Sequence, residues 1–413
     1  MKPMNDLLKR LGLPAISPLF DKCCAEALAE PGIPGWLTEN FLRETARELP
    51  VLTNNLETVV SALPKVVSQP DLVLFAKTLY RMLGIRAHHE TVFPGLVFPK
   101  APAGEDPIAW DLFPLYPMLA RIREAYEGLA RRGIPRELLH ATAAGVDGSI
   151  SASFRRAGRP AFIPLYFLWC TTHSNGSLLR LNRFSYEIRE NMELPVRAFV
   201  NGSGETALLM REESVLDSSG RLWDAGGAKD SQKAFAAVYR ETADGFEGNP
   251  VDLSSARVGK DTVLLPKALW KPLYQPGDPL ISIHIPKGEP LSAALVEHSL
   301  KEAAEFYQTY FPEKWLRAFM CISWLLAPEL RALLKPESNI LQFGARFSRF
   351  PVLSQGTEVF NFVFSRVVDT LSPELLDTLP EDSSLQRAMK DFYRRGNIIP
   401  ETGGLLPFSG LSK

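Results

Sequence analysis

The chain has few cysteines and no excess of either charge. Four of its 413 residues are cysteine, at Cys23, Cys24, Cys170 and Cys321. This spacing fits neither a paired metal site nor a disulfide framework, so we expect reduced thiols. Lys and Arg total 46 against 47 Asp and Glu, a formal net charge of −1. Because no basic surplus is available to neutralise phosphates, nucleic acid is excluded as the expected main partner.

Long apolar runs are also missing. The sequence has no stretch of about 18 apolar residues, the length that spans a bilayer. The first residues, MKPMNDLLKRLGLP, lack the unbroken apolar core of a signal peptide. We therefore expect no membrane attachment and a cytoplasmic location. Apolar residues make up 46% and charged residues 23%, as in globular proteins, and the length predicts two domains.

Residues 1–175 are expected to form an all-α domain. Apolar residues recur at three- and four-residue spacing over 37–49, 56–67, 72–83 and 115–131. A further helix is expected over 162–170. Between them, residues 93–107 are rich in proline, which lacks the N–H donor and interrupts helices. We interpret that stretch as a surface loop.

Strand signals begin after Ser174-Asn175-Gly176. Alternating, β-branched or aromatic runs cover 178–188, 196–200, 207–215 and 234–241. We expect a second domain over 176–370, with a short helix at 267–274, followed by one helix and a tail over 371–413.

The most informative block lies between residues 278 and 350. An apolar strand, 280–285, is followed by a polar loop, 287–289, a helix that begins near Ser292, and a second apolar strand, 317–326. This order predicts a crossover unit with two parallel strands. Ligands of parallel sheets gather at the carboxyl ends of such strands. A short helix at 328–334 and a strand at 339–343 are expected to follow.

Several short phrases in this block resemble a known family. They are Gly277-Asp278, His284-Ile285-Pro286, Ser299, Phe306 with Phe311-Pro312, Cys321-Ile322-Ser323-Trp324-Leu325-Leu326, and Ser338-Asn339-Ile340 with Phe343. Together they resemble a bacterial family of acyltransferase-domain proteins, most closely over 239–347. The resemblance implies an α/β (α+β) architecture in which an all-α N-terminal domain precedes a GNAT-like mixed-sheet acyltransferase domain.

The resemblance also implies a function and a cofactor site. In the family fold, two central parallel strands splay apart and hold acyl-CoA, with the pantetheine paired to the first strand and the pyrophosphate on the amides before the helix. Acetyl-CoA or a longer acyl-CoA would serve as co-substrate, and an amine of a small molecule or peptide would accept the acyl group. The cofactor-binding residues implied here are Ile283, Ile285, Lys287, Gly288, Ser292, Ser323 and Asn339. Ser323 and Asn339 also fit purely structural roles.

The expected pyrophosphate loop departs from the usual pattern. GNAT enzymes generally carry an Arg/Gln-x-x-Gly-x-Gly/Ala loop, whose glycines let several amides converge on the phosphates. Residues 285–292 read IPKGEPLS instead. One glycine remains, two prolines remove N–H donors, and Glu289 adds a negative charge that Lys287 could offset. Cofactor binding is therefore inferred from the fold rather than from a motif.

Three residues are candidates for acid-base catalysis. His284 ends the first strand and has a suitable ordinary pKa, although a histidine hydrogen-bonded inside the sheet is the alternative. Glu241 and Tyr239 share one face of the 234–241 run, although a solvated or arginine-paired carboxylate is the alternative for Glu241. His88-His89-Glu90 lacks metal-ligand spacing, and we expect no metal. Two other functions stay open: a non-catalytic binding or scaffold protein of the same fold, and an acyl-thioester hydrolase.

Overall fold

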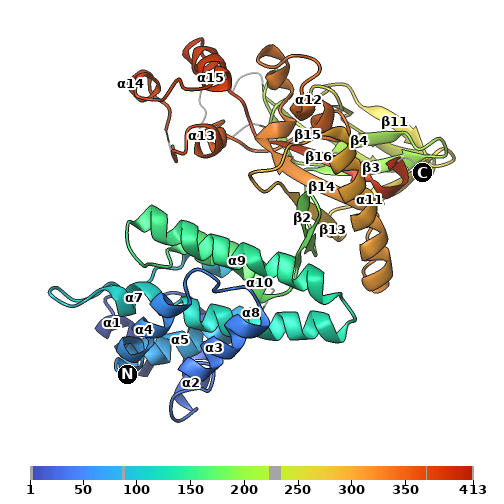
Figure 1. Ribbon diagram of the computed structural model, residues 1–413. Coiled ribbons are helices and arrows are strands. Elements are labelled where there is room, and N and C mark those ends of the chain that lie inside the picture. The colour runs from blue at the N-terminus through green and yellow to red at the C-terminus, as the bar shows by residue number, and fades with distance from the viewer. Residues whose placement is uncertain (1–2, 86–88, 223–233, 369, 412–413) are drawn as a thin grey trace. The chain divides into compact units, whose positions relative to one another are not determined.

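The computed structural model describes residues 3–85, 89–222, 234–368 and 370–411. The chain divides into two compact units, Met1–Arg180 and Leu181–Lys413 (Figure 1). His88 and the side chains of His89 and Glu90, considered above for metal binding, lie outside the described part.

The first unit is helical up to Ser174, which confirms the predicted all-α region. Its helices are α1 (Pro3–Arg10), α2 (Pro18–Leu28), α3 (Glu39–Glu48), α4 (Leu56–Val67), α5 (Pro70–Leu83), α6 (His89–Val92), α7 (Ile108–Leu112), α8 (Leu115–Arg131), α9 (Arg136–Ala157) and α10 (Pro164–Ser174). Ser17 and Thr38 accept backbone N–H groups at the starts of α2 and α3, and Pro70 occupies the first turn of α5. Pro64 lies inside α4 and does not end it.

Helix α9 was not predicted from the sequence. It is rich in Ala, Gly and Ser, so its apolar stripe is weak. A buried carboxylate holds it in place instead: Asp147 accepts hydrogen bonds from the backbone N–H of Asn54 and the side-chain amide of Asn55, at 3.1 and 2.9 Å. These contacts attach α9 to the segment that begins α4.

Among the described residues no single helix is long and apolar enough to cross a membrane. Helices α4 and α5, which are bent by 115° at their junction, reach the length and apolar content of a membrane span only when taken together.

The structure contains a mixed six-stranded sheet, as predicted. In order across the sheet, its strands are β1 (Leu178–Leu181), β2 (Phe184–Arg189), β13 (Leu280–His284), β14 (Ala318–Ser323), β16 (Thr402–Pro407) and β15 (Ser348–Pro351). Strand β13 pairs with β14 in parallel and with β2 antiparallel, whereas β16 is antiparallel to both β14 and β15. The predicted crossover unit is therefore confirmed.

Helix α11 (Ala293–Tyr310) is the crossover helix and packs on the sheet (Figure 1). Ser292 is its N-cap residue, as expected. The hydroxyls of Tyr186 and Ser299 lie 2.8 Å apart, and the Tyr307 hydroxyl donates to the Tyr186 carbonyl at 3.1 Å. Because all three side chains are buried, these bonds fix the position of the helix on β2.

The opposite face of the sheet packs against smaller antiparallel sheets. Their strands are β3 (Val196–Asn201), β4 (Thr206–Met210) and β12 (Trp270–Tyr274), then β5 (Val215–Leu216) with β6 (Phe235–Ala236), and β9 (Val251–Asp252) with β10 (Arg257–Val258). A further sheet of β7 (Tyr239–Glu241), β8 (Gly245–Gly248) and β11 (Val263–Pro266) packs on β3 and β4 instead. Met320, Phe350 and Leu405 form one core with Val196 and Leu208. The prediction of a helix at 267–274 is wrong, because residues 270–274 pair with β3 as a strand.

The C-terminal part differs from the expectation in two places. Residues 339–343 belong to a helix, α12 (Asn339–Gly344), whose first turn is capped by the Ser338 hydroxyl, and the predicted strand there is wrong. The segment after 371 is not one helix and a tail. It contains α14 (Pro373–Asp377), α15 (Ser384–Arg394) and the inner strand β16.

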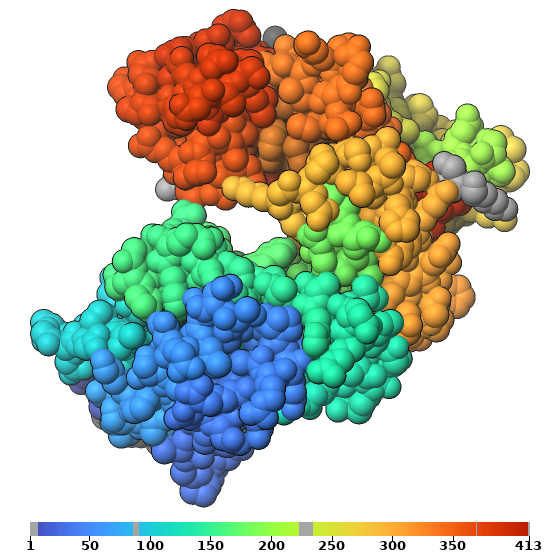
Figure 2. Space-filling view, in the orientation of Figure 1, coloured from blue at the N-terminus to red at the C-terminus, as the bar shows by residue number. Residues whose placement is uncertain are grey.

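A second core joins this region to the crossover block. Helix α13 (Glu358–Val363) and helices α14 and α15 contribute Phe360, Leu376 and Met389, which pack with Trp324 and Leu330. The last two come from short 3₁₀ helices, η5 (Trp324–Leu326) and η6 (Pro328–Ala332). In Figure 2 the surface of the red helical segment is continuous with the orange segment that follows β14.

Candidate functional site

Strands β13 and β14 separate toward their carboxyl ends. They pair at two positions, Ile281 with Phe319 and Ser282 with Met320. Beyond these positions, each of the two strands still pairs with its outer neighbour: Ile283 of β13 pairs with Tyr186 of β2, and Ile322 of β14 pairs with Gly403 of β16. The pairing of β13 with β14 therefore ends before Ile283 and Ile322.

From Ile283 and Cys321 onward, the facing backbone groups of the two strands are not paired with each other, and we call this stretch of the sheet the opening. Ile322 is 38% exposed although its strand has neighbours on both sides, whereas Ile283 is 3% exposed. An extended ligand can satisfy unpaired strand amides and carbonyls by adding to the strand edge. The opening is thus suited to an extended chain with amide groups.

His284 lies at the end of β13 beside an acid on β2. Its Nε2 atom is 3.0 Å from Oε2 of Glu187, and the two side chains are 29% and 7% exposed. Ser282 pairs with Glu187 and His284 pairs with Ser185, so the contact is diagonal across two antiparallel strands. His284 is thus hydrogen-bonded within the sheet, the alternative to a catalytic role given above.

The same contact sets the ionisation of Glu187. Burial opposes its charge, but the hydrogen bond with His284 and the charge of Arg189 outweigh burial and lower the pKa of Glu187. An ionised carboxylate accepts hydrogen bonds only, so Nε2 of His284 is the donor. In a neutral ring Nδ1 is then the basic atom, which is the arrangement that general-base catalysis needs.

The polar loop after β13 leads directly to the start of α11. Lys287, Gly288 and Glu289 are exposed, and Ile285 is half-buried. Gly288 has φ +111°, a conformation that glycine adopts most readily, which explains the one glycine retained in the loop. The side chain of Ser292 makes no capping bond, so it does not occupy the N–H groups of the first turn.

Tyr239 and Glu241 lie on β7, in a different sheet from His284. Glu241 forms an ion pair with Lys267 at 2.8 Å and its side chain is 57% exposed. Tyr239 packs beneath the guanidinium of Arg197, 4.3 Å from the ring centre. Contacts in the described ranges do not bring either residue to His284, and their catalytic role stays a prediction.

Ser323 and Asn339 have structural surroundings. The Ser323 hydroxyl accepts the N–H of Leu325 at 3.2 Å and caps η5. Asn339 is exposed and opens α12, where Ser338 is the capping residue. Ser323 is also the last residue of β14, at the mouth of the opening. Ligand contacts by these two residues remain predictions.

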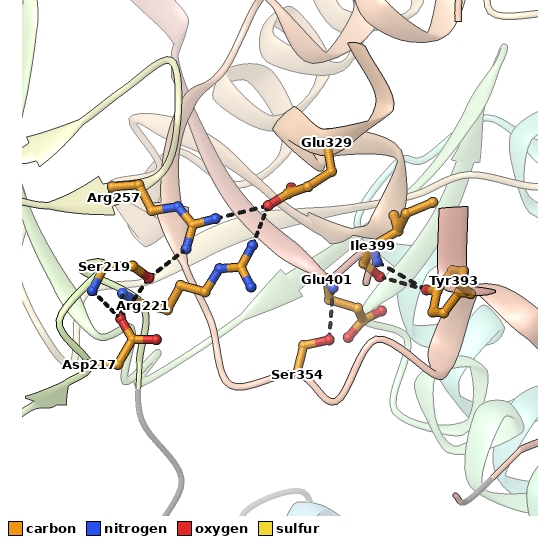
Figure 3. Close-up of polar contacts among 9 residues, drawn as sticks. All are labelled: Asp217, Ser219, Arg221, Arg257, Glu329, Ser354, Tyr393, Ile399 and Glu401. Carbon is orange, nitrogen blue, oxygen red and sulfur yellow. Dashed lines mark hydrogen bonds and ion pairs between the residues drawn. The ribbon is translucent and has the colours of Figure 1, made fainter. Parts of the chain in front are cut away.

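Glu401 is a carboxylate near this end of the sheet that the sequence did not single out. It precedes Thr402, which pairs with Ser323 at the end of β14. Its N–H donates to the hydroxyl of Ser354 at 2.8 Å (Figure 3). That hydroxyl in turn donates to Glu358 at 2.9 Å. Burial, and then the charge of Glu358, raise the pKa of Glu401 to about 7.

A second polar cluster joins β10 to η6. Arg221 and Arg257 donate to the same oxygen of Glu329, at 2.7 and 3.0 Å (Figure 3). Because Glu329 is partly buried and paired with both guanidiniums, we interpret this cluster as structural. Within the described residues there is no group of three or more His, Cys, Asp or Glu side chains that could hold a metal ion.

Comparison with known proteins agrees with this architecture. Residues 178–406 match the sequence profile of the GNAT-like C-terminal domain, and residues 40–176 match that of the N-acyltransferase N-terminal domain. A search of curated proteins found no match.

Solved acyltransferase structures share the fold over nearly the whole chain. One, a mutant acyltransferase in complex with octanoyl-CoA, has a TM-score of 0.63, 21% identity, and coverage of 98% of this chain and 99% of that chain. Another, in complex with decanoyl-CoA and teicoplanin, has a TM-score of 0.62, 21% identity and the same coverage. This protein belongs to the acyltransferase family that joins an N-acyltransferase N-terminal domain to a GNAT-like C-terminal domain.

Proposed function

We propose that this protein is an acyl-CoA-dependent N-acyltransferase. The observation that carries the proposal is the end of β13–β14 pairing after Ser282 and Met320, with an exposed loop and the start of α11 directly beyond β13. An acyl-CoA laid in the opening would place its pantetheine amides on the free edge of β13. Its pyrophosphate would lie at the loop of residues 287–289. The similar solved structures contain octanoyl-CoA, decanoyl-CoA and CoA, which supports this choice of co-substrate.

The proposed reaction transfers the acyl group to an amine. The amine nitrogen attacks the thioester carbonyl, the C–S bond breaks, and CoA leaves as a thiolate. Nδ1 of His284 would take the proton from the amine and return it to the leaving thiolate, while Glu187 stabilises the charged imidazole. Unpaired N–H groups of the separated strands would stabilise the oxyanion. Placing both reactants in one site supplies much of the rate.

The acceptor is proposed to be an amine on a small molecule or peptide. Two of the similar structures contain teicoplanin or a form of it, which supports a peptide-like acceptor of moderate size. A thioester already carries an activated acyl group, so the proposed reaction needs no metal.

Ligand-induced stabilisation tests the proposal. The melting temperature of the full chain should rise with octanoyl-CoA and should not rise with octanoate alone, because a ligand that binds the folded state stabilises it by mass action. An amine acceptor library with octanoyl-CoA should then release CoA thiol, and mass spectrometry should find the octanoyl amide. Absence of any melting shift at millimolar acyl-CoA would favour the scaffold alternative. Thiol release without an added amine would favour the hydrolase.

A further inference from the structure

Arg183 lies behind the loop that leads into α11. It is 3% exposed, and it follows β1 in the turn toward β2. Its Nε atom donates to the carbonyl of Pro290 at 3.1 Å, and its Nη1 atom donates to the carbonyl of Pro286 at 3.0 Å. One buried guanidinium therefore holds both ends of the segment Lys287-Gly288-Glu289.

The turn that carries Arg183 is itself attached to α11. Asn182 has φ +50°, a left-handed conformation that asparagine tolerates, and its side-chain amide donates to Glu302. The Ser299 hydroxyl donates to the Leu181 carbonyl at 2.7 Å. Since Leu181 and Asn182, the two residues directly before Arg183, both contact α11, the start of the turn is fixed relative to this helix.

The direction of the two prolyl carbonyls determines the direction of two amides. In a trans peptide the C=O and the following N–H point in opposite directions, and no cis peptide occurs in the described chain. The N–H groups of Lys287 and Leu291 must therefore point away from Arg183. Across the parts of the chain that the structure describes, neither N–H has a hydrogen-bond acceptor.

We propose that Arg183 is a positioning residue for acyl-CoA: it turns the Lys287 and Leu291 amides outward to receive the pyrophosphate. In the usual GNAT loop, glycines allow the amides to converge. Here an arginine from a turn distant in the sequence orients them, and the prolines contribute the carbonyls that it binds. The positive charge behind the loop adds attraction for the phosphates. This inference rests on the proposed function.

Two probes separate a role in pyrophosphate binding from a general structural role. Octanoyl-CoA carries the pyrophosphate, whereas octanoyl-pantetheine carries the same acyl chain and pantetheine without it. For Arg183→Met, calorimetric titration should show a Kd for octanoyl-CoA that is higher by about tenfold or more, as expected for the loss of a charge-assisted hydrogen-bond pair. The Kd for octanoyl-pantetheine should not change. Arg183→Lys, which keeps the charge but loses the planar fork that reaches both carbonyls, should have a Kd between those of wild type and Arg183→Met. Arg211→Met, which removes an exposed arginine paired with Glu193, is the matched control.

Equal losses for both probes, or no loss for either, would overturn the inference while leaving the proposed function intact. Wild-type protein that binds neither probe would overturn both. If Arg183→Met does not fold, Gly288→Ala replaces it: no atom lies within 4 Å of the added Cβ, so the substitution strains the loop only through its φ of +111°. The same selective loss of octanoyl-CoA affinity is expected, and unchanged affinity for octanoyl-CoA counts against the inference.

Discussion

His284 and Glu187 form a hydrogen-bonded pair at the mouth of the opening between β13 and β14, with 3.0 Å between Nε2 and Oε2. The carboxylate is almost fully buried and the imidazole is partly exposed. A buried acid that holds one nitrogen of an imidazole leaves the other nitrogen as the basic atom, which is how acids orient catalytic histidines in other enzymes. This pair is therefore the most direct target for mutagenesis.

Replacement of His284 should impair chemistry rather than cofactor binding. His284→Gln is expected to lower kcat with an amine acceptor by about 10²- to 10⁴-fold, the usual contribution of a general base. The Kd for octanoyl-CoA should stay at the wild-type value. Steady-state kinetics and calorimetry measure the two quantities, and His298→Gln, an exposed histidine on α11, is the control.

The same kinetic assay tests the other two candidates. Glu241→Gln and Tyr239→Phe should lower kcat if β7 contributes to catalysis. Unchanged kcat in both variants would remove them from the site and leave Glu241 as the exposed partner of Lys267.

Glu187 should make stability depend on acidic pH. Its folded-state pKa is lowered, so the ionised group stabilises the protein above its unfolded pKa of about 4.3, and this stability is lost as pH falls through the folded pKa. Glu187→Gln should lower the free energy of unfolding by about 1–3 kcal/mol at pH 7, the cost of weakening a buried charged hydrogen bond. Urea denaturation from pH 7 downward should show the wild type converging on the variant. A constant difference at every pH would contradict this assignment.

A large side chain at Ile322 should close the opening. Because Ile322 is 38% exposed on the unpaired part of β14, Ile322→Trp should leave the fold intact and block octanoyl-CoA. The expected result is a normal melting temperature without ligand and no shift on addition of octanoyl-CoA. Leu264→Trp, at a 52% exposed position on β11, controls for the added indole. Wild-type affinity in Ile322→Trp would show that the ligand does not enter between these strands.

Glu401 should change the pH dependence of stability in the direction opposite to Glu187. Its folded-state pKa of about 7 lies above the unfolded value, so its contribution to stability is full below about pH 4.3 and is lost as pH rises through 7. Glu401→Gln mimics the neutral acid. It should be more stable than wild type by about 1–2 kcal/mol at pH 8.5, after allowance for solvent screening, and equal to it at pH 4. Urea titrations at the two pH values measure the difference, and the exposed Glu305→Gln serves as control. Equal stability of wild type and Glu401→Gln at pH 8.5 would show that Glu401 is not buried enough to resist ionisation.

Local patterns predicted most of the elements near the site. The apolar stripe of α11 and the apolar run of β14 could be recognised in the sequence because apolar side chains repeat at different intervals in helices and in strands. The helix–strand confusion at 267–274 and 339–343 arose where short segments carry few residues of either period. In both cases the outcome depends on neighbours: β3 supplies the partner for Trp270–Tyr274, and Ser338 caps the turn that starts α12.

Only part of the candidate site could be predicted from the sequence. His284 was identified from its place at the end of a strand, but its partner Glu187 lies 97 residues earlier and carries no local signal. Arg183 was missed for the same reason, since it reaches the loop from a turn more than 100 residues away. Sequence patterns record the surroundings along the chain, whereas these contacts depend on which strands become neighbours.

The sequence by itself determined that a helical region precedes a mixed α/β region and that a parallel crossover lies near residues 280–326, because side-chain periodicity and turn residues act locally. Only the tertiary structure decided that β16, from the end of the chain, lies between β14 and β15, and that β13 loses its pairing with β14 after Ser282. Strand order and strand separation depend on how distant faces pack and on where each backbone hydrogen bond finds its partner. Those are properties of the assembled sheet and not of any one segment.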